Sequence, residues 1–217
     1  GYTRQTGKIA PVCVNGGPGG TNAITGVFGA YVDSIPMFVV TGQAKRETTV
    51  WSTNLPLRQL GDQEVNITSA VSTMTKYAKM ITDPMSIRKE VEKAWFLMLN
   101  GRPGPVWLDI PGDVASTFIE TDDLEGFDKQ GYIDEHWASF NQGNPVYDEQ
   151  YTKDVLAKIK EAKRHVILAG TAIRHANQQN EFIKCIDKLG IPVVTAWDAH
   201  DIIWDEHPLY LSLIHIS

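Results

Sequence analysis

The chain has 217 residues, of which 42% are hydrophobic and 21% charged, and its formal net charge is -6. This composition is typical of globular proteins, and the length suits one large domain or two small ones. The acidic balance argues against a nucleic-acid partner, which would need clustered Lys and Arg, and no apolar run approaches the roughly 18 residues of a membrane helix.

The first predicted unit begins with a strand that ends in glycines. Residues 9–14 form an apolar run that predicts a strand, and residues 21–33 show the apolar spacing of a helix. Between them lies Gly16-Gly17-Pro18-Gly19-Gly20-Thr21-Asn22. Glycine lets backbone approach a ligand, and ligands of open α/β sheets bind beyond the carboxyl ends of the strands. The loop is therefore a candidate ligand site, and a tight turn without a ligand fits it equally well.

This glycine loop does not match the common phosphate-binding motifs. Counted from Gly17, a G-x-G-x-x-G frame places Asn22 where the third glycine belongs, and no G-K-[ST] follows. Pro18 also removes one backbone donor. The loop is better suited to packing against an apolar or heteroaromatic ring than to cradling a diphosphate.

The next elements are a strand, a long loop, a short helix and a third strand. Residues 37–40 predict a strand buried on both faces, which should end at the same edge as the glycine loop. Residues 44–61 lack periodicity and are either a functional loop or a surface excursion. Asp62 is predicted as the N-cap of a helix over residues 62–69, and residues 76–81 predict a strand.

Asp83-Pro84 marks the start of a longer helix, because a carboxylate N-cap followed by proline favours helix initiation. Arg88 and Glu92 are predicted to pair on its solvated face, and Trp95 is assigned to the core along with Phe96. The turn that follows leads into a strand over residues 106–111.

Residues 115–150 lose this pattern and predict an acidic surface linker, after which a second α/β unit begins. That unit, residues 151–210, predicts a parallel sheet. Its glycine turn at Gly170 lacks a dinucleotide fingerprint. Residues 211–217 follow no earlier pattern and resemble a translated sequencing adapter, so we expect a non-native tail. The elements of the second unit are expected over residues 151–162, 165–169, 178–189 and 191–195.

Cysteine and histidine usage give no sign of a disulfide framework or a metal site. The two cysteines are Cys13, which we expect to be a buried and inert thiol because its strand neighbours are apolar, and Cys185. Such usage favours a reducing compartment, and we expect the cytoplasm. The six histidines show no metal-ligand spacing, so no metal-binding residue is predicted.

A set of short motifs follows in order along the first unit. The motifs are Gly1-Tyr2-Thr3-Arg4, Gly17-Pro18-Gly19-Gly20-Thr21-Asn22, Asp33-Ser34-Ile35-Pro36, Thr41-Gly42-Gln43, Asp62-Gln63-Glu64, Thr75-Lys76 and Gly101-Arg102-Pro103-Gly104-Pro105 with Asp109-Ile110-Pro111. Together they closely resemble the pyrimidine-binding domain of thiamine diphosphate-dependent enzymes of the acetolactate synthase type. The resemblance covers residues 1–114, and residues 151–210 resemble the start of that family's central domain. It implies an α/β fold, with a flavodoxin-like parallel-sheet domain truncated at its N-terminus and a truncated Rossmann-like domain after it.

The resemblance also implies roles for individual residues. Pro18, Gly19 and Asn22 match the wall that holds the pyrimidine ring, and Gln63 matches both a cofactor contact and the active-site glutamine of a Phe-Gln-Glu motif. Here Asp62 stands where that motif has phenylalanine, which changes the substrate pocket. Lys76 matches a lysine near the substrate channel, although a solvated strand lysine is the simpler interpretation.

For the complete protein, the resemblance implies decarboxylation of a 2-oxo acid such as pyruvate and transfer of the acyl-anion equivalent to a second carbonyl, as in branched-chain amino acid biosynthesis. The expected cofactors are thiamine diphosphate and Mg²⁺, the latter held by a later domain, and FAD is left open. The family's essential glutamate would precede Gly1, so we expect the chain alone to be inactive. The expected assembly is a homodimer or homotetramer.

Three alternatives remain open from the sequence. One is a different decarboxylase or oxidase of the same family, of the oxalyl-CoA or phenylpyruvate type. Another is a catalytically silent homologue that acts as a binding subunit. The third is a nucleotide-binding α/β protein of another kind, which would need a phosphate fingerprint that neither glycine turn has.

Overall fold

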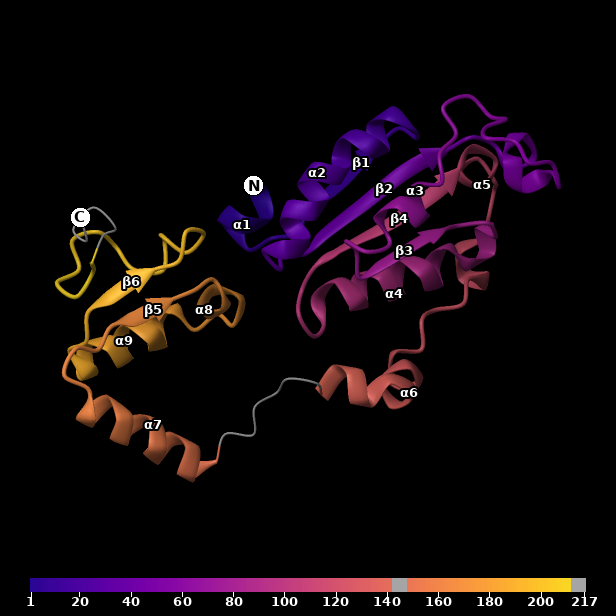
Figure 1. Ribbon diagram of the computed structural model, residues 1–217. Helices are drawn as coiled ribbons and strands as arrows, with labels where there is room; N and C mark the ends of the chain where they lie inside the picture. The colour runs from indigo at the N-terminus through magenta and orange to yellow at the C-terminus, as the bar shows by residue number, and fades with distance from the viewer. Residues whose placement is uncertain (142–147, 212–217) are drawn as a thin grey trace. The chain divides into compact units, whose positions relative to one another are not determined.

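A computed structural model describes residues 1–141 and 148–211 of the chain, with side chains up to residue 136 in the first range (Figure 1). The backbone divides into two compact units, residues 1–142 and 143–217. Each is an α/β unit with parallel strands, which confirms the predicted fold class. The predicted non-native tail falls almost wholly on residues 212–217, outside the described ranges.

The first unit is built on a four-stranded parallel sheet in the order β1-β2-β4-β3. Thr41 pairs with Val14 on one side and with Asp109 on the other, so the carboxyl ends of three strands meet at one edge. This is the edge that the sequence assigned to the glycine loop. The strands are β1 (Pro11–Val14), β2 (Met37–Gln43), β3 (Tyr77–Met80) and β4 (Pro105–Pro111).

Helices cover both faces of this sheet (Figure 1). On one face α2 and α3 pack around Val39 and Trp107, and on the other α4 packs around Phe38 and Leu108, all four of these side chains being buried. Alternate residues of each strand thus serve two separate cores, as expected for a parallel sheet. The helices are α1 (Tyr2–Thr6), α2 (Pro18–Val32), α3 (Ile67–Val71), α4 (Ile87–Leu99), α5 (Gly112–Ala115) and α6 (Lys129–Asn141).

Two predicted helix starts are wrong. Helix α2 begins at Pro18 rather than at residue 21, because proline suits the first helical position. Helix α3 begins at Ile67 with Asn66 as its cap, whose side chain accepts from the backbone N–H of Ser69 at 3.1 Å. Asp62 is not the cap, because the residue after it adopts a positive φ of 56° that a helix does not allow.

The start of the α4 region is confirmed. Asp83 caps a short 3-10 turn that leads into α4, accepting from Met85 N at 3.0 Å, and Arg88 bonds Glu92 at 3.0 Å. Trp95 is 47% exposed, so its assignment to the core is wrong; its ring only flanks Phe38 at the margin of the core, with centroids 6.1 Å apart.

Cys13 is exposed, which contradicts the predicted buried thiol. Strand β1 lies at the edge of the sheet. Val12 faces the core formed by α2 and α3, so Cys13 points to the opposite face of the sheet. Helix α4 packs on that opposite face, against β2, β3 and β4. An apolar strand sequence does not distinguish an edge strand from a central one.

Part of the predicted linker, residues 115–150, packs on the first unit. Phe127 and Tyr132 contact Phe96 of α4 with ring centroids 5.7 and 6.3 Å apart. Glu92 accepts from Phe127 N at 2.8 Å, and the Lys93 ammonium lies 5.2 Å from the centre of the Tyr132 ring. The acidic stretch thus precedes a short docked segment that composition alone does not reveal.

The second unit contains the predicted helix-strand alternation. Gly190 ends α9 with φ of 64°, where the sequence expects the helix to stop at residue 189. Among the described residues, no helix of either unit is long and apolar enough to cross a membrane. The elements are α7 (Glu149–Glu161), β5 (Ile167–Ala169), α8 (Ala172–His175), α9 (Gln179–Leu189) and β6 (Val193–Thr195).

Candidate functional site

The glycine loop lies in close contact with two other segments at the carboxyl edge of the first sheet. A Cβ on Gly16 would lie 2.4 Å from the carbonyl oxygen of Gly42, just before the end of β2. A Cβ on Gly17 would lie 2.3 Å from the carbonyl oxygen of Gln63, and Gly17 has φ of 54°. The two glycines are therefore required by contacts between three chain segments, beyond the needs of a local turn.

The first turn of α2 presents few free donors. Pro18 has no N–H, Gly20 N donates to Asn15 O at 3.1 Å, and Thr21 N donates to Gly17 O at 2.9 Å. A phosphate site at a helix N-terminus needs several outward N–H groups. This geometry agrees with the sequence argument against a diphosphate cradle.

The residues predicted to contact a cofactor gather around this loop. Pro18, Asn22 and Gln63 are exposed, and Gly19 is half-buried. Asn15 Nδ2 donates to Gln63 Oε1 at 3.5 Å, which links the loop after β1 to the segment before α3. The structure thus presents an exposed backbone surface that carries the side-chain amides of Asn22 and Gln63. The roles of Pro18, Gly19, Asn22 and Gln63 stay predictions.

Beneath this surface lies a buried polar network. Asp109, on β4, is 0% exposed and accepts from Thr41 Oγ1 at 2.7 Å and from Gln43 Nε2 at 3.0 Å. Trp107 Nε1 donates to Thr41 Oγ1 at 2.8 Å. Burial raises the pKa of the Asp109 carboxyl, and the two hydrogen bonds oppose that rise. The sequence analysis missed this role, although a carboxylate inside an apolar strand is a visible signal for it.

Glu64 organises the loop of residues 44–61. Its carboxylate accepts from the backbone N–H groups of Val50 at 2.8 Å, Leu60 at 3.0 Å and Gly61 at 3.0 Å. Partial burial would raise the pKa of Glu64, but these three bonds outweigh it and lower that pKa. Glu64, which the sequence showed only as part of a motif, is therefore the main anchor of the loop of residues 44–61.

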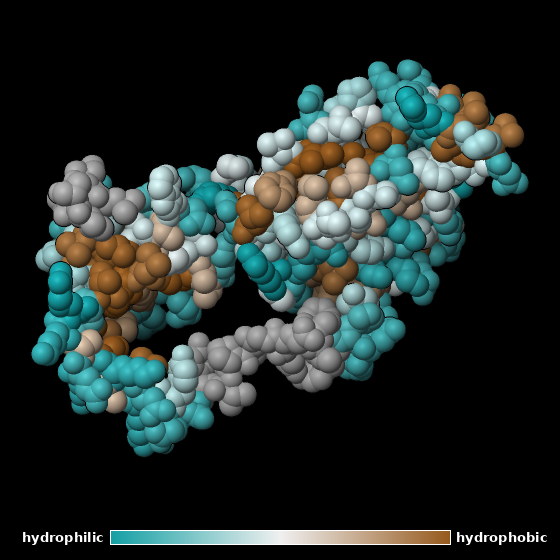
Figure 2. Space-filling view, in the orientation of Figure 1, coloured by the Kyte–Doolittle hydropathy of each residue, from teal (hydrophilic) through white to brown (hydrophobic). Residues whose placement is uncertain are grey.

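The same loop is fixed at its start and carries apolar side chains on its surface. Arg46 bonds Asp113 through its backbone N at 3.0 Å and its Nε at 2.6 Å, and those bonds lower the pKa of the Asp113 carboxyl. Figure 2 shows apolar surface over this segment. The exposed large apolar residues there are Trp51, Leu55, Leu57 and Leu60.

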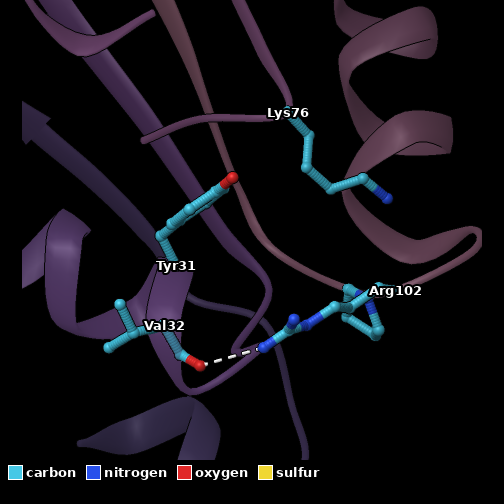
Figure 3. Close-up of a pocket in the computed structure, with 5 residues that line it drawn as sticks. Tyr31, Val32, Lys76 and Arg102 are labelled. Atoms are coloured by element: carbon cyan, nitrogen blue, oxygen red, sulfur yellow. Dashed lines mark hydrogen bonds between the residues drawn. The ribbon is translucent and has the colours of Figure 1, made fainter. Parts of the chain in front are cut away.

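Lys76 directly precedes β3, whose first residue pairs with Val106 near the start of β4. It therefore lies at the amino end of the sheet, opposite the edge that carries Gln63. It lines an open groove of about 390 Å³ together with Tyr31, Val32, Arg102 and Pro103 (Figure 3). Its Nζ donates to the carbonyl of Asn100, and burial lowers its pKa. Lys76 is thus half-buried and bonded, unlike the solvated lysine of the simpler interpretation.

Within the two described ranges, no cluster of three or more His, Cys, Asp or Glu side chains could hold a metal ion. The acidic stretch before α6 accordingly forms no cation site among those residues.

Two family models match the sequence of the chain. Residues 1–70 match the family model for the thiamine pyrophosphate enzyme N-terminal TPP binding domain, and residues 152–216 match the model for the thiamine pyrophosphate enzyme central domain. The two models together cover more than half of the chain, and the chain belongs to this family.

The chain is also similar to individual acetolactate synthases. The chain is 32% identical over 195 residues to the acetolactate synthase large subunit of Lactococcus lactis, covering 90% of this chain and 31% of that protein. It is 30% identical over 216 residues to acetolactate synthase from Arthrospira platensis, covering 99% of this chain and 34% of the relative. A probable acetolactate synthase large subunit from Methanococcus aeolicus is 30% identical over 217 residues, covering 99% and 33% respectively. The chain spans about a third of the length of these relatives.

Proposed function

We propose that this chain is part of an enzyme of the acetolactate synthase type, which decarboxylates a 2-oxo acid such as pyruvate and transfers the acyl-anion equivalent to a second carbonyl compound. The observation that carries the proposal is the identity of about 30% to acetolactate synthases over 90–99% of the chain. The contacts of Gly16 and Gly17 support it, because they build a bare backbone surface at the edge where such a domain would hold its cofactor.

The residues present fit the aminopyrimidine ring of thiamine diphosphate. Pro18 and Gly19 offer a surface without polar side chains, and the amides of Asn22 and Gln63 can donate to or accept from ring nitrogens. When bound, the cofactor supplies a nucleophilic carbon and an electron sink for decarboxylation. In this proposal Gln63 orients the substrate or ring by hydrogen bonding, and the Glu64 anchor keeps the neighbouring loop against it.

Further properties belong to the proposal for the complete protein. We propose that Mg²⁺ and the cofactor diphosphate are held outside this chain, that the enzyme is a cytoplasmic homodimer or homotetramer, and that the chain alone does not turn over pyruvate.

A second candidate within the family is a decarboxylase with a different 2-oxo acid substrate. The observation that favours it is Asp62, an exposed carboxylate next to Gln63. A carboxylate in a pocket wall repels an anionic substrate and would select for a substrate with a compensating polar or cationic group.

The test is an assay of the complete gene product with thiamine diphosphate, Mg²⁺ and pyruvate. Formation of acetolactate supports the proposal, and consumption of another 2-oxo acid with no reaction of pyruvate supports the second candidate. Gln63→Ala should lower kcat/KM at least tenfold, while Gln130→Ala, an exposed glutamine on α6, should leave it unchanged. Lack of reaction with any 2-oxo acid would overturn both, and turnover of pyruvate by the 217-residue chain would contradict its proposed inactivity.

A further inference from the structure

We propose that Asp109 is a positioning residue, which acts through Thr41 and Gln43 to hold the glycine loop and the Gln63 segment in their shapes. Assigning these two segments to cofactor binding rests on the proposed function. The positioning itself rests on the contacts of Asp109, Thr41 and Gln43, whose side chains are buried.

The first link runs from Asp109 to the glycine loop. Thr41 donates to Asp109 at 2.7 Å and accepts from Trp107 at 2.8 Å, so its side chain is held from two directions. A Cβ on Gly20 would lie 3.4 Å from Cγ2 of Thr41 and 3.3 Å from Ile67. The first turn of α2 therefore lies next to the hydrogen-bonded Thr41 side chain, with little room for a side chain at Gly20.

The second link runs from Asp109 to the Gln63 segment. Gln43 Nε2 donates both to Asp109 Oδ2 at 3.0 Å and to the carbonyl oxygen of Val65 at 2.9 Å, while Gln43 Oε1 accepts from Ala44 N at 3.0 Å. Val65 is two residues from Gln63. One side chain thus ties the ends of β2 and β4 to the backbone that carries the predicted active-site glutamine.

The chemistry of the network depends on an acceptor at Asp109. The carboxylate offers one oxygen to Thr41 and the other to Gln43, both of which are donors. An amide at this position would turn one of these acceptors into a donor that faces another donor. A buried donor without an acceptor is costly, so the network should rearrange and release one of its two links.

The test compares variants of the 217-residue chain by amide hydrogen exchange. Thr41→Val and Asp109→Asn should speed exchange of the Gly20 and Ile67 amides at least tenfold relative to amides of α4, and Thr41→Ser, which keeps the hydroxyl but lacks Cγ2, should lose less protection than Thr41→Val. Tyr77→Phe is the matched control, because it removes a hydrogen bond to the Glu90 carboxylate on α4, at the other face of the sheet. It should loosen β3 and α4 without affecting Gly20 or Ile67.

Equal acceleration of all amides in Thr41→Val would show only a loss of global stability and would overturn the inference. Thr41→Ser keeps the test valid if Asp109→Asn fails to fold.

In the complete gene product, Thr41→Val should raise the KM for thiamine diphosphate about tenfold with a change in kcat below twofold, and an unchanged KM would overturn the positioning role. If the wild-type product does not bind thiamine diphosphate, the proposed function fails, and the exchange ratios still decide whether Asp109 positions the two segments.

Discussion

Both units of the chain contain a strand that ends in glycine and leads into a helix, yet the two turns differ in what surrounds them. In the first unit, the glycines after β1 touch the backbone of Gly42 and of Gln63. In the second unit, a Cβ on Gly170 would meet no atom within 4 Å, and Gly170 does not have a positive φ. The same local sequence feature is a junction of three segments in one unit and a simple turn in the other.

Each unit also buries polar side chains, among them Asp109 in the first unit and His207 in the second. Asp109 lies near the carboxyl end of β4, beneath the glycine loop. His207 is 5% exposed, bonds Asp187 near the end of α9 at 3.2 Å, and accepts from Leu209 N at 3.2 Å, close to the start of β6. Asp109 thus joins β4 to β2 beneath the glycine loop, whereas His207 holds the segment that returns to the sheet in the second unit.

The largest expected effect separates the two glycine turns. Gly17→Ala should cost about 3 kcal/mol of unfolding free energy, because a left-handed backbone and a 2.3 Å contact cannot both be relieved. Gly170→Ala should change it by less than about 0.5 kcal/mol. Urea denaturation of both variants measures the difference, and similar losses would show that the turns are equivalent.

The next effect belongs to the second unit. His207→Ala should destabilise that unit by about 2 kcal/mol, because it leaves a cavity and removes the acceptor of the Leu209 N–H. Hydrogen exchange should show the loss in β5 and β6 and leave β2 and β4 unchanged. His165→Ala, at an exposed histidine of the same unit, is the control and should have little effect.

Glu64→Gln should have a smaller and more local effect. One of the three backbone donors would then face an amide N–H, so residues 50–61 should be cleaved several-fold faster by a protease, with little change in global stability. Gln59→Ala removes a single hydrogen bond to Gly61 O in the same loop. It tests whether the loss of any one bond in this loop is enough to speed the cleavage.

The Glu64 anchor also predicts a pH dependence. Because its pKa is lowered in the folded protein, its stabilising contribution is complete above the ordinary value of 4.5 and is lost as the pH falls from there through the folded pKa. Cleavage of residues 50–61 by an acid-active protease should therefore accelerate below about pH 4.5 in the wild type. The same acceleration in Glu64→Gln would assign it to another group.

The smallest expected effect concerns the segment docked on α4. Lys93→Met keeps the aliphatic stem but removes the ammonium that lies 5.1 Å from the Tyr77 ring and 5.2 Å from the Tyr132 ring. A loss of about 0.5 kcal/mol is expected, seen as faster exchange over residues 124–132. Lys89→Met, which removes an ion pair with Glu125 of the same segment, tests whether the loss of another cation on this helix has the same effect.

The sequence predicted what local chemistry determines. The Asp83 cap and the Arg88–Glu92 pair were readable from spacing, and so was the position of the glycine loop at a strand end. The start of α3 was missed because the positive φ of Gln63 accompanies its contact with Gly17, a residue distant in sequence. Whether Cys13 is covered depends on strand order, which no spacing within β1 records.

Pro18, Gly19, Asn22 and Gln63 were singled out through motifs shared with a family, and the structure places them at one edge, while their roles there stay predictions. The supports beneath them were missed, because the bonds of Glu64 and Asp109 join segments far apart along the chain. A carboxylate within an apolar strand is the one signal that could have singled out Asp109.

The attachment of the Gln63 segment has an evolutionary consequence. The segment is held by main-chain groups and by flanking residues: Gln43 binds the Val65 carbonyl, Glu64 binds the Gly61 N–H, and Gly17 packs on the Gln63 carbonyl. None of these contacts uses the side chain of Asp62, which is exposed. Substitutions at position 62 can therefore accumulate at little cost to folding, so this exposed position can diversify while the backbone frame around it is retained.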